Sequence, residues 1–448
     1  MSTHIAHSLS SINRLDALVL YRPRSLGLSV KIFKASSSIG GTWCMNQYPG
    51  VRTDSEAEIY QYKLEELWKD WTWKEKYPSV DVIQAYFRYV DEKLDLKRDI
   101  YFDTRVVSAK WDKPSRLCSR LWIVSTANGI STQVQYFILC TGSLSKPLIP
   151  DIKTLSDFEG SCFHTSRWPR EGLDLTGKRV AVIGTESSGI QVIEHIASQV
   201  RHLTVFRRTP NLALPLSQSH FPDEDQAEMK ETGLYNRIFR RLSETFGRFL
   251  FPQRKHGGYT VNSEAYAFWR TKVTERVQDP ALHEKLAPSI PPHPFGIKRP
   301  GLEKAYFEVF DRGNVSLVDV KETPIKRVTT DGLELHSGTT HIFDVLVLAT
   351  GFESLTGAIL DLDIRGSNDI SIREKKYSRI ATKRDVEEVW RNLVLEIASK
   401  RLWDRAESSW YTGSNMAAST RRTEMLALSG GLPSHLEKCA EAVANGYQ

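Results

Sequence analysis

The sequence predicts an α/β protein built on two Rossmann-like dinucleotide-binding domains. A glycine turn between a strand and a helix begins near Lys178, and two other apolar runs end in Thr-Gly. The chain has 448 residues, of which 40% are hydrophobic and 25% are charged. At roughly 100–200 residues per domain, this size and composition suit two or three soluble globular domains.

The segment from 178 to 206 is a candidate βαβ unit. The apolar run 180–183 meets Gly184, a helix-period segment follows, and 200–206 forms a second apolar run. The apolar residues of the predicted helix share one face. They are Ile190, Ile193, Ile196 and Ala197. This order of strand, tight turn, helix and strand is typical of dinucleotide-binding crossovers.

The glycine fingerprint of this unit is incomplete. Gly184 and Gly189 occupy the first and last positions of G-x-G-x-x-G, but Glu186 occupies the middle one. A carboxylate there adds bulk and negative charge where the backbone normally approaches a pyrophosphate. One interpretation is therefore a βαβ unit that binds no nucleotide.

Basic residues directly after the second strand favour nucleotide binding. Arg207, Arg208 and Thr209 follow the run that ends at Phe206. This strand end faces the adenosine ribose, where an arginine suits the 2′-phosphate of NADP. The alternative is that both arginines form an ordinary solvated strand end.

Two further apolar runs, 137–142 and 344–351, each stop at Thr-Gly. Continuous apolar runs are typical of buried parallel strands, and the glycine lets the backbone turn close to a ligand. Because the runs flank the βαβ unit, they suggest strands that cross between two cofactor domains.

Two longer segments carry a family resemblance. Residues 39–56 closely resemble the flavin-contacting segment of Baeyer–Villiger monooxygenases, a class of FAD- and NADPH-dependent flavoproteins. Residues 158–169 match that family's fingerprint F-x-G-x-x-x-H-x-x-x-W-P at every defined position, with His164 as its histidine. Within this match we expect His164 to be more than a satisfied linker histidine. The resemblance extends over most of 26–447 and includes 71–73, 293–300, 349–352 and 409–415.

The resemblance implies a reaction and its central residues. NADPH would reduce FAD, the reduced flavin would activate dioxygen, and one oxygen atom would enter a ketone beside its carbonyl to give an ester or lactone. Arg299 matches the family's catalytic arginine, whose fixed charge would stabilise the anions of this reaction. Asp54 matches the aspartate that orients it, and Lys298 a residue on the NADP phosphate. The alternative is that residues 298–300 form a loop that happens to be basic.

Further residues are carried over from the family by position. On the flavin side they are Thr42, Trp43, Cys44, Met45, Asp54, Ser55, Tyr60 and Val106. On the NADP side they are Arg52, Thr53, Gly184, Thr185, Glu186, Ser187, Ser188, Gly189, Ile190, Gln191, Arg208, Thr209, Lys298 and Trp410. We expect Trp71 and Trp73 to pack in the core instead.

The sequence departs from the family in three places. Residues 10–24 contain no glycine, so the FAD glycine motif is missing from the N-terminal region, and Pro23 falls where a helix should run. Lys34 ends the second strand, where the family has an acid that binds the FAD ribose. The stretch 366–410 is much shorter than in the family, so a C-terminal part of the active site is missing. A second hypothesis follows, in which the chain is a degenerate relative that folds but binds flavin poorly and has no redox activity.

The predicted domain order is an FAD-binding domain interrupted by an NADP-binding domain with a helical insertion. The FAD domain takes residues 1–150 and 352–448. The NADP domain takes 151–210 and 299–351, and the insertion takes 211–298. A basic stripe in the insertion is expected to be a solvated helix face; it comprises Arg237, Arg240, Arg241 and Lys255.

Charge and composition limit the kinds of partner that we expect for this protein. The net charge of +6 comes without a long basic run, so we expect no nucleic-acid partner, and no run approaches the ~18 apolar residues of a membrane span. The five cysteines contain no C-x-x-C pair, which argues against a metal site and favours a reducing, cytoplasmic location. The expected partners are a small ketone, drawn from secondary metabolism, and O2. The identity of the ketone and the oligomeric state stay open.

Overall fold

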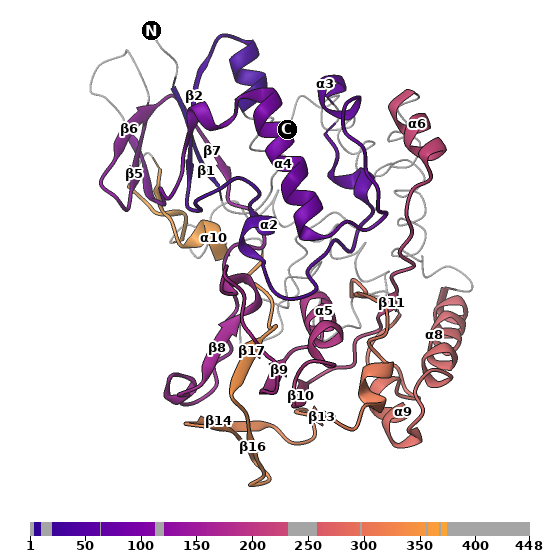
Figure 1. The fold of residues 1–448 in the computed structure, drawn as a ribbon. Helices are drawn as coiled ribbons and strands as arrows, with labels where there is room; N and C mark the ends of the chain where they lie inside the picture. The colour runs from indigo at the N-terminus through magenta and orange to yellow at the C-terminus, as the bar shows by residue number, and fades with distance from the viewer. Residues whose placement is uncertain are drawn as a thin grey trace.

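The computed structural model describes residues 4–9, 20–62, 64–112, 121–231, 258–295, 298–354, 357–366 and 369–373 of the chain. Two parallel sheets form two lobes, in the upper and lower halves of Figure 1. This arrangement confirms the predicted α/β class with two Rossmann-like units. In the part of the chain just defined, no helix is long and apolar enough to cross a membrane.

The first sheet has the strand order β3-β2-β1-β7, and every pair is parallel. Its strands are β1 (His4–Leu9), β2 (Ser29–Lys34), β3 (Ile100–Tyr101) and β7 (Tyr136–Cys140). Counted along the chain, this is the 3-2-1-4 order of a dinucleotide-binding half. Strand β1 therefore takes the central position of that half, although the glycine motif that should follow it is absent from the sequence. The helical residues 20–25 include Pro23, whose carbonyl accepts hydrogen bonds from the amides of Leu26 and Leu28 as the helix ends.

Helix α4 (Val80–Leu94) covers this sheet with an apolar face. Ile83, Tyr86 and Val90 pack with Ile32 of β2 and with Trp73 in one buried cluster. Trp73 is 2% exposed and its indole N–H donates to Gln61, which confirms its predicted role in the core.

An antiparallel layer lies beside the first sheet, in the order β18-β4-β5-β6 with β18 parallel to β4. Its strands are β4 (Val106–Asp112), β5 (Leu121–Thr126), β6 (Ser131–Val134) and β18 (Asp363–Arg365). The short helices of this half are α2 (Thr42–Met45), η1 (Ala57–Tyr60), α3 (Glu65–Trp68), η2 (Lys97–Asp99) and α10 (Gly357–Leu360).

The second sheet has the order β13-β10-β9-β17-β8, again with every pair parallel. Its strands are β8 (Ser161–His164), β9 (Arg179–Ile183), β10 (His202–Arg207), β13 (Val315–Asp319) and β17 (Val345–Leu348). Helix α5 (Ser187–Ile196) connects β9 to β10, as the periodicity predicts. Its predicted apolar residues are all at most 2% exposed. A small antiparallel sheet follows β13, formed by β14 (Ile325–Thr329), β15 (Gly332–Leu335) and β16 (Thr340–Ile342). The remaining 3-10 turns are η3 (Leu155–Asp157), η4 (Thr165–Arg167) and η5 (Glu308–Asp311).

The excursion after β10 is mostly helical in its described residues. It contains α6 (Asp223–Glu231), α8 (Gly258–Thr274) and α9 (Pro280–Leu286), and β11 (Leu214–Pro215) pairs with β12 (Leu302–Glu303) at its two ends. Arg276 ties it to the lower lobe, because its guanidinium pairs with the buried carboxylate of Glu303 at 2.7 Å and with Glu308 at 2.6 Å. The predicted basic stripe lies outside the described residues.

The two lobes are joined where the chain segments that follow β7 and β17 cross from one lobe to the other and run side by side. The amide of Leu148 donates to the carbonyl of Gly351 at 2.8 Å, and the Thr350 hydroxyl donates to the carbonyl of Leu148 at 2.6 Å. The two Thr-Gly runs are thus the strands β7 and β17 that feed the crossings, as predicted from the sequence.

His164 reinforces this joint. One ring nitrogen lies 2.9 Å from the carbonyl oxygen of Gly351 and the other 2.9 Å from the Ser166 hydroxyl. The side chain is 3% exposed, and burial lowers its pKa from 6.5 to about 4. The expectation that His164 does more than satisfy a linker is not supported here, since both nitrogens are used within the joint.

We predict that acid loosens this joint through His164. Because the folded protein holds the ring neutral, the unfolded chain binds the extra proton, so stability is full above pH 6.5 and falls as the pH drops toward 4. His164→Gln should flatten this dependence by up to about 1.4 kcal/mol per pH unit. Urea unfolding at several pH values measures the slope. His220→Gln, at an exposed histidine, should keep the wild-type slope; an equally steep slope for His164→Gln would contradict the prediction.

Candidate active site

The turn between β9 and α5 requires both of its glycines. Gly184 has a φ of +106°, and a Cβ there would lie 2.3 Å from the carbonyl oxygen of Ala349. A Cβ on Gly189 would lie 2.3 Å from the carbonyl oxygen of Gly184. The helix therefore starts in backbone contact with the strands, as the first and last glycines of a dinucleotide fingerprint allow.

Glu186 stands at the N-cap of α5 without capping it. Its φ of −78° is ordinary, so the backbone does not require glycine at this position. The side chain is exposed, and one carboxylate oxygen lies 3.5 Å from the amide nitrogen of Asn211. Desolvation of the carboxyl group by the surrounding protein raises the pKa of Glu186, and the positive charges of Lys298 and Arg208 act in the opposite direction. The structure thus brings both predicted phosphate-binding cations to the glycine turn, together with the predicted opposing acid.

Arg207 and Arg208 have different environments. Arg208 is exposed, whereas Arg207 is 2% exposed and pairs with Asp319 at 2.8 Å. The interpretation of Arg207 as a solvated or phosphate-binding strand end is wrong, because its side chain is buried and paired with Asp319, and only Arg208, just beyond the strand, is exposed.

Arg299 and Asp54 meet although they are far apart in the sequence. The Arg299 guanidinium pairs with Asp54 Oδ1 and donates to the Ser55 hydroxyl at 3.2 Å. The Ser187 hydroxyl donates to Asp54 Oδ2 at 3.1 Å. Asp54 therefore connects the arginine to the first turn of α5, with the Arg299 side chain 50% exposed and free to face a ligand.

The predicted flavin-side residues cluster around α2. Gly40 and Gly41 precede this helix with φ values of +118° and +49°. The Trp43 ring packs edge-on against Tyr60 at 5.5 Å between centroids, and Gln84 donates to the Trp43 carbonyl at 2.7 Å. Cys44 is buried with its sulfur 2.8 Å from the Ser38 hydroxyl, and Met45 is 40% exposed.

Thr53 offers an unusual polar group beside this cluster. Its side chain is 0% exposed, and its hydroxyl has no hydrogen-bond partner among the described residues. Buried hydroxyls are normally satisfied, so this one is available for a ligand or water.

Several predicted cofactor residues already use their side chains elsewhere. Ile190 is 0% exposed in the core, and Thr185 hydrogen-bonds Tyr306. Val106 is 2% exposed in the core of the antiparallel layer, so any ligand contact there would come from its backbone. Gln191 bonds to Tyr48 and Arg52. Ser188 hydrogen-bonds the Tyr48 side chain. Trp410 lies outside the described residues.

Lys34 decides how well the first lobe suits FAD. It ends β2, as predicted, and is 1% exposed. A buried lysine at this strand end supplies no acceptor for ribose hydroxyls. The strand end that would meet the adenosine ribose of FAD therefore does not fit that group.

Sequence reasoning predicted the segment that carries Asp54 but missed its contact with α5. Tyr48 and Gly50 dock this segment on α5, through the Gln191 side chain and backbone. A polar stripe on α5 at spacing i, i+4 and i+8 could have signalled it; the stripe consists of Ser187, Gln191 and His195.

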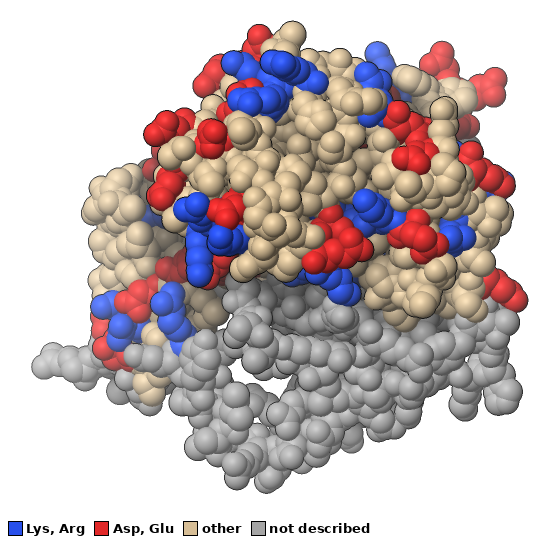
Figure 2. Space-filling view, turned by 90° about the horizontal axis from the view of Figure 1, so that it is seen from below, with Lys and Arg blue, Asp and Glu red and all other residues tan. Residues whose placement is uncertain are grey.

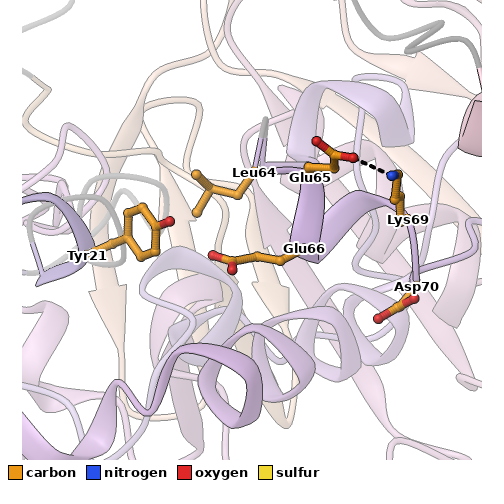
Figure 3. Close-up of a pocket in the computed structure, with 6 residues that line it drawn as sticks. All are labelled: Tyr21, Leu64, Glu65, Glu66, Lys69 and Asp70. Atoms are coloured by element: carbon orange, nitrogen blue, oxygen red, sulfur yellow. Dashed lines mark ion pairs between the residues drawn. The ribbon is translucent and has the colours of Figure 1, made fainter. Parts of the chain in front are cut away.

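One hollow of about 450 Å³ lies away from all these residues (Figure 3). It is lined by α3 and Tyr21, and its Glu65 and Lys69 form an ion pair with each other. Its walls carry none of the predicted site residues.

The described residues also contain no cluster of three metal-ligating side chains. The coloured face in Figure 2 mixes acidic and basic side chains rather than forming one basic surface.

Comparison with known proteins identifies relatives over nearly the whole chain. Cyclopentanone 1,2-monooxygenase of Comamonas sp. is 34% identical, over 96% of this chain and 92% of that protein. The alignment has 517 positions, more than this chain has residues, so part of that relative has no counterpart here. Cyclohexanone 1,2-monooxygenase of Acinetobacter sp. is 33% identical, over 78% of this chain and 69% of that protein.

Solved structures agree. Cyclohexanone monooxygenase from Rhodococcus sp. Phi1, bound to NADP+, matches with a TM-score of 0.85 and 28% identity over 100% of this chain and 99% of that one. OTEMO in complex with FAD and NADP matches with a TM-score of 0.83 and 26% identity, over 100% of this chain and 99% of that one.

The family model described as flavin-binding monooxygenase-like matches residues 25–285. Together with the fold and the relatives, this match shows that the chain belongs to the flavin-binding monooxygenase-like family, among the Baeyer–Villiger monooxygenases.

Proposed function

We propose that this protein is an NADPH-consuming flavin monooxygenase that inserts one oxygen atom of O2 beside a ketone carbonyl, giving an ester or lactone. The observation that carries the proposal is the contact of Arg299 with Asp54 and of Asp54 with Ser187. It supports the proposal because it brings a half-exposed cation from the lower lobe to the predicted flavin segment of the upper one. The ketone, and an origin in secondary metabolism, stay predictions.

NADP suits the glycine turn and its cations. The turn leaves backbone amides at the start of α5 open to a pyrophosphate, while Arg208 and Lys298 supply positive charge for a 2′-phosphate. Glu186 opposes both, because its exposed carboxylate lies among the same groups.

FAD, when bound, would supply the electron transfer and oxygen activation of the reaction. The residues of this chain would orient the reacting groups and supply positive charge beside them. Asp54 holds the Arg299 guanidinium in place, and that guanidinium would stabilise negative charge that develops during oxygen transfer.

One observation favours a second function. The buried Lys34 gives the FAD ribose no acceptor, and residues 10–24 lack the glycines that would approach its pyrophosphate. The alternative is a relative that folds, binds flavin poorly and has no redox activity. Cofactor content separates the two: flavin absorbance in stoichiometric amount after purification argues against the alternative.

Arg208 should set the preference for NADPH over NADH. Because Arg208 is exposed beside the turn, the protein should bind NADPH more tightly than NADH, and Arg208→Ala should weaken NADPH by roughly 10- to 100-fold with little effect on NADH. Fluorescence titration of both cofactors measures this. Arg201→Ala, at another exposed arginine, should change neither affinity. Equal wild-type affinities for the two cofactors would contradict the assignment.

Glu186 should limit NADPH affinity. Glu186→Gly removes both the charge and the bulk, so NADPH should bind more tightly, and the same titration detects it. Glu186→Gln keeps the size and removes only the charge, which separates repulsion from crowding. If neither variant changes the affinity, the cofactor takes a different path past the turn.

Oxygen insertion should depend on Arg299. With NADPH and added FAD, the wild type should convert a probe ketone such as cyclopentanone to its lactone, and 18O2 should label the product. Arg299→Ala should lose lactone formation while NADPH still reduces the flavin under anaerobic conditions, because the negative charge develops only later. Arg312→Ala, an exposed arginine outside the site, serves as the control. Equal loss of reduction and insertion would show that Arg299 is structural, and absence of lactone from the wild type would favour the alternative function.

A further inference from the structure

Helix α5 meets the Asp54 segment along one continuous face. Ser187, Gln191 and His195 recur every fourth residue, so they lie above one another on the helix. Each contacts the segment 48–54 of the upper lobe: Ser187 bonds Asp54, Gln191 bonds Tyr48 and Arg52, and His195 lies against Gly50. The opposite face of α5 carries Ile190 and Ile193 into the lower lobe's core.

The Gln191 side chain makes the central contacts. Its Oε1 accepts hydrogen bonds from the Tyr48 hydroxyl at 2.9 Å and from the Arg52 amide at 3.3 Å. Its Nε2 donates to the Arg52 carbonyl at 3.2 Å. The Gln191 side chain thus satisfies both the N–H and the C=O of Arg52, which lies two positions before Asp54. Gln191 is itself 6% exposed.

The segment lies close against the helix at this contact. Tyr48 is buried, and its hydroxyl donates to Gln191. A Cβ on Gly50 would lie 2.8 Å from the Gln191 carbonyl oxygen, so the segment rests directly on the helix backbone. Gln191 also follows Gly189 by two residues, which places it one turn or less from the glycine turn.

We infer that Gln191 is a positioning residue that couples the dinucleotide turn to the Asp54 segment. A ligand that orders the start of α5 orders Gln191 with it, and Gln191 then holds Arg52 and Asp54 in the place where Asp54 meets Arg299. This inference rests on the proposed NADP site and adds a role for Gln191 that does not involve touching the cofactor.

Hydrogen–deuterium exchange of the full-length protein tests the inference without relying on activity. In the absence of ligand, Gln191→Leu should speed exchange of the peptide covering 48–54 by roughly tenfold, because it removes all three bonds while keeping the side-chain size. Tyr48→Phe, a milder change, should give a smaller increase. Gln199→Leu, on an exposed glutamine near the end of α5, should leave the peptide unchanged. Unchanged exchange in both site variants would overturn the role of Gln191.

Adding NADP+ tests the coupling itself. In the wild type, NADP+ should slow exchange in 184–190 and also in 48–54; in Gln191→Leu it should still slow 184–190 but no longer 48–54. A merely structural Gln191 would leave the ligand-induced protection of 48–54 intact, and that result would overturn the coupling. If NADP+ slows neither segment in the wild type, the proposed cofactor site is wrong, while the ligand-free comparison still decides whether Gln191 holds the segment.

Discussion

The site depends on the backbone contact that fixes the start of helix α5. Gly184 and Gly189 let three backbone segments approach within distances that exclude any Cβ, so the start of α5 packs directly against the strands of the sheet that it leaves. Once the helix is fixed, its direction is set, and its polar stripe must face the upper lobe. Ser187 then meets Asp54, and Asp54 meets Arg299. The contact between Asp54 and Arg299, to which we assign the proposed catalytic role, thus follows from a packing constraint between strands rather than from the loop that carries Arg299.

The two lobes are also joined at a second place, and the two joints differ in kind. The paired crossings at Leu148 and Gly351 are held by backbone hydrogen bonds and capped by the buried ring of His164. The contact of α5 with the segment 48–54 relies on side chains, mainly Gln191. Backbone hydrogen bonds hold the two crossing segments together, whereas a side-chain contact can be strengthened or weakened by a ligand that binds at the start of α5. This difference is why we assign coupling to Gln191 and not to His164.

Much of the fold could be predicted from the sequence, because it depends on local patterns. Apolar runs, the 3.6-residue period and glycines at strand ends are read directly, and they placed β9, α5, β10, β7 and β17 correctly. Strand β1 could not be anticipated from HIAHSL alone, since its place depends on pairing with β2 and β7 rather than on its own pattern. The site was only partly predictable. The position of Arg299 beside Asp54 came from family resemblance, and the burial of Arg207 against Asp319 needed the register between β10 and β13. The docking of Tyr48 on Gln191 joins residues far apart in sequence: the polar stripe of α5 signals that this helix face has a partner, but no local pattern identifies Tyr48 as that partner.

The departures from the family lie at the proposed dinucleotide sites and not among the contacts that bring Asp54 to Arg299. Lys34 and the glycine-free stretch before it lie at the end of the first lobe where the family resemblance places the adenosine of FAD. The contacts that place Asp54 and Arg299 come from α5, the segment 48–54 and the loop before β12, and none of them involves Lys34 in the described residues. A chain can therefore keep the catalytic geometry while losing affinity for the cofactor that would use it. Glu186 is a comparable departure at the turn of the lower lobe to which we assign NADP. It adds negative charge there while both required glycines stay in place. We expect both departures to change how strongly a dinucleotide is held, and neither takes part in the contacts among Ser187, Asp54 and Arg299.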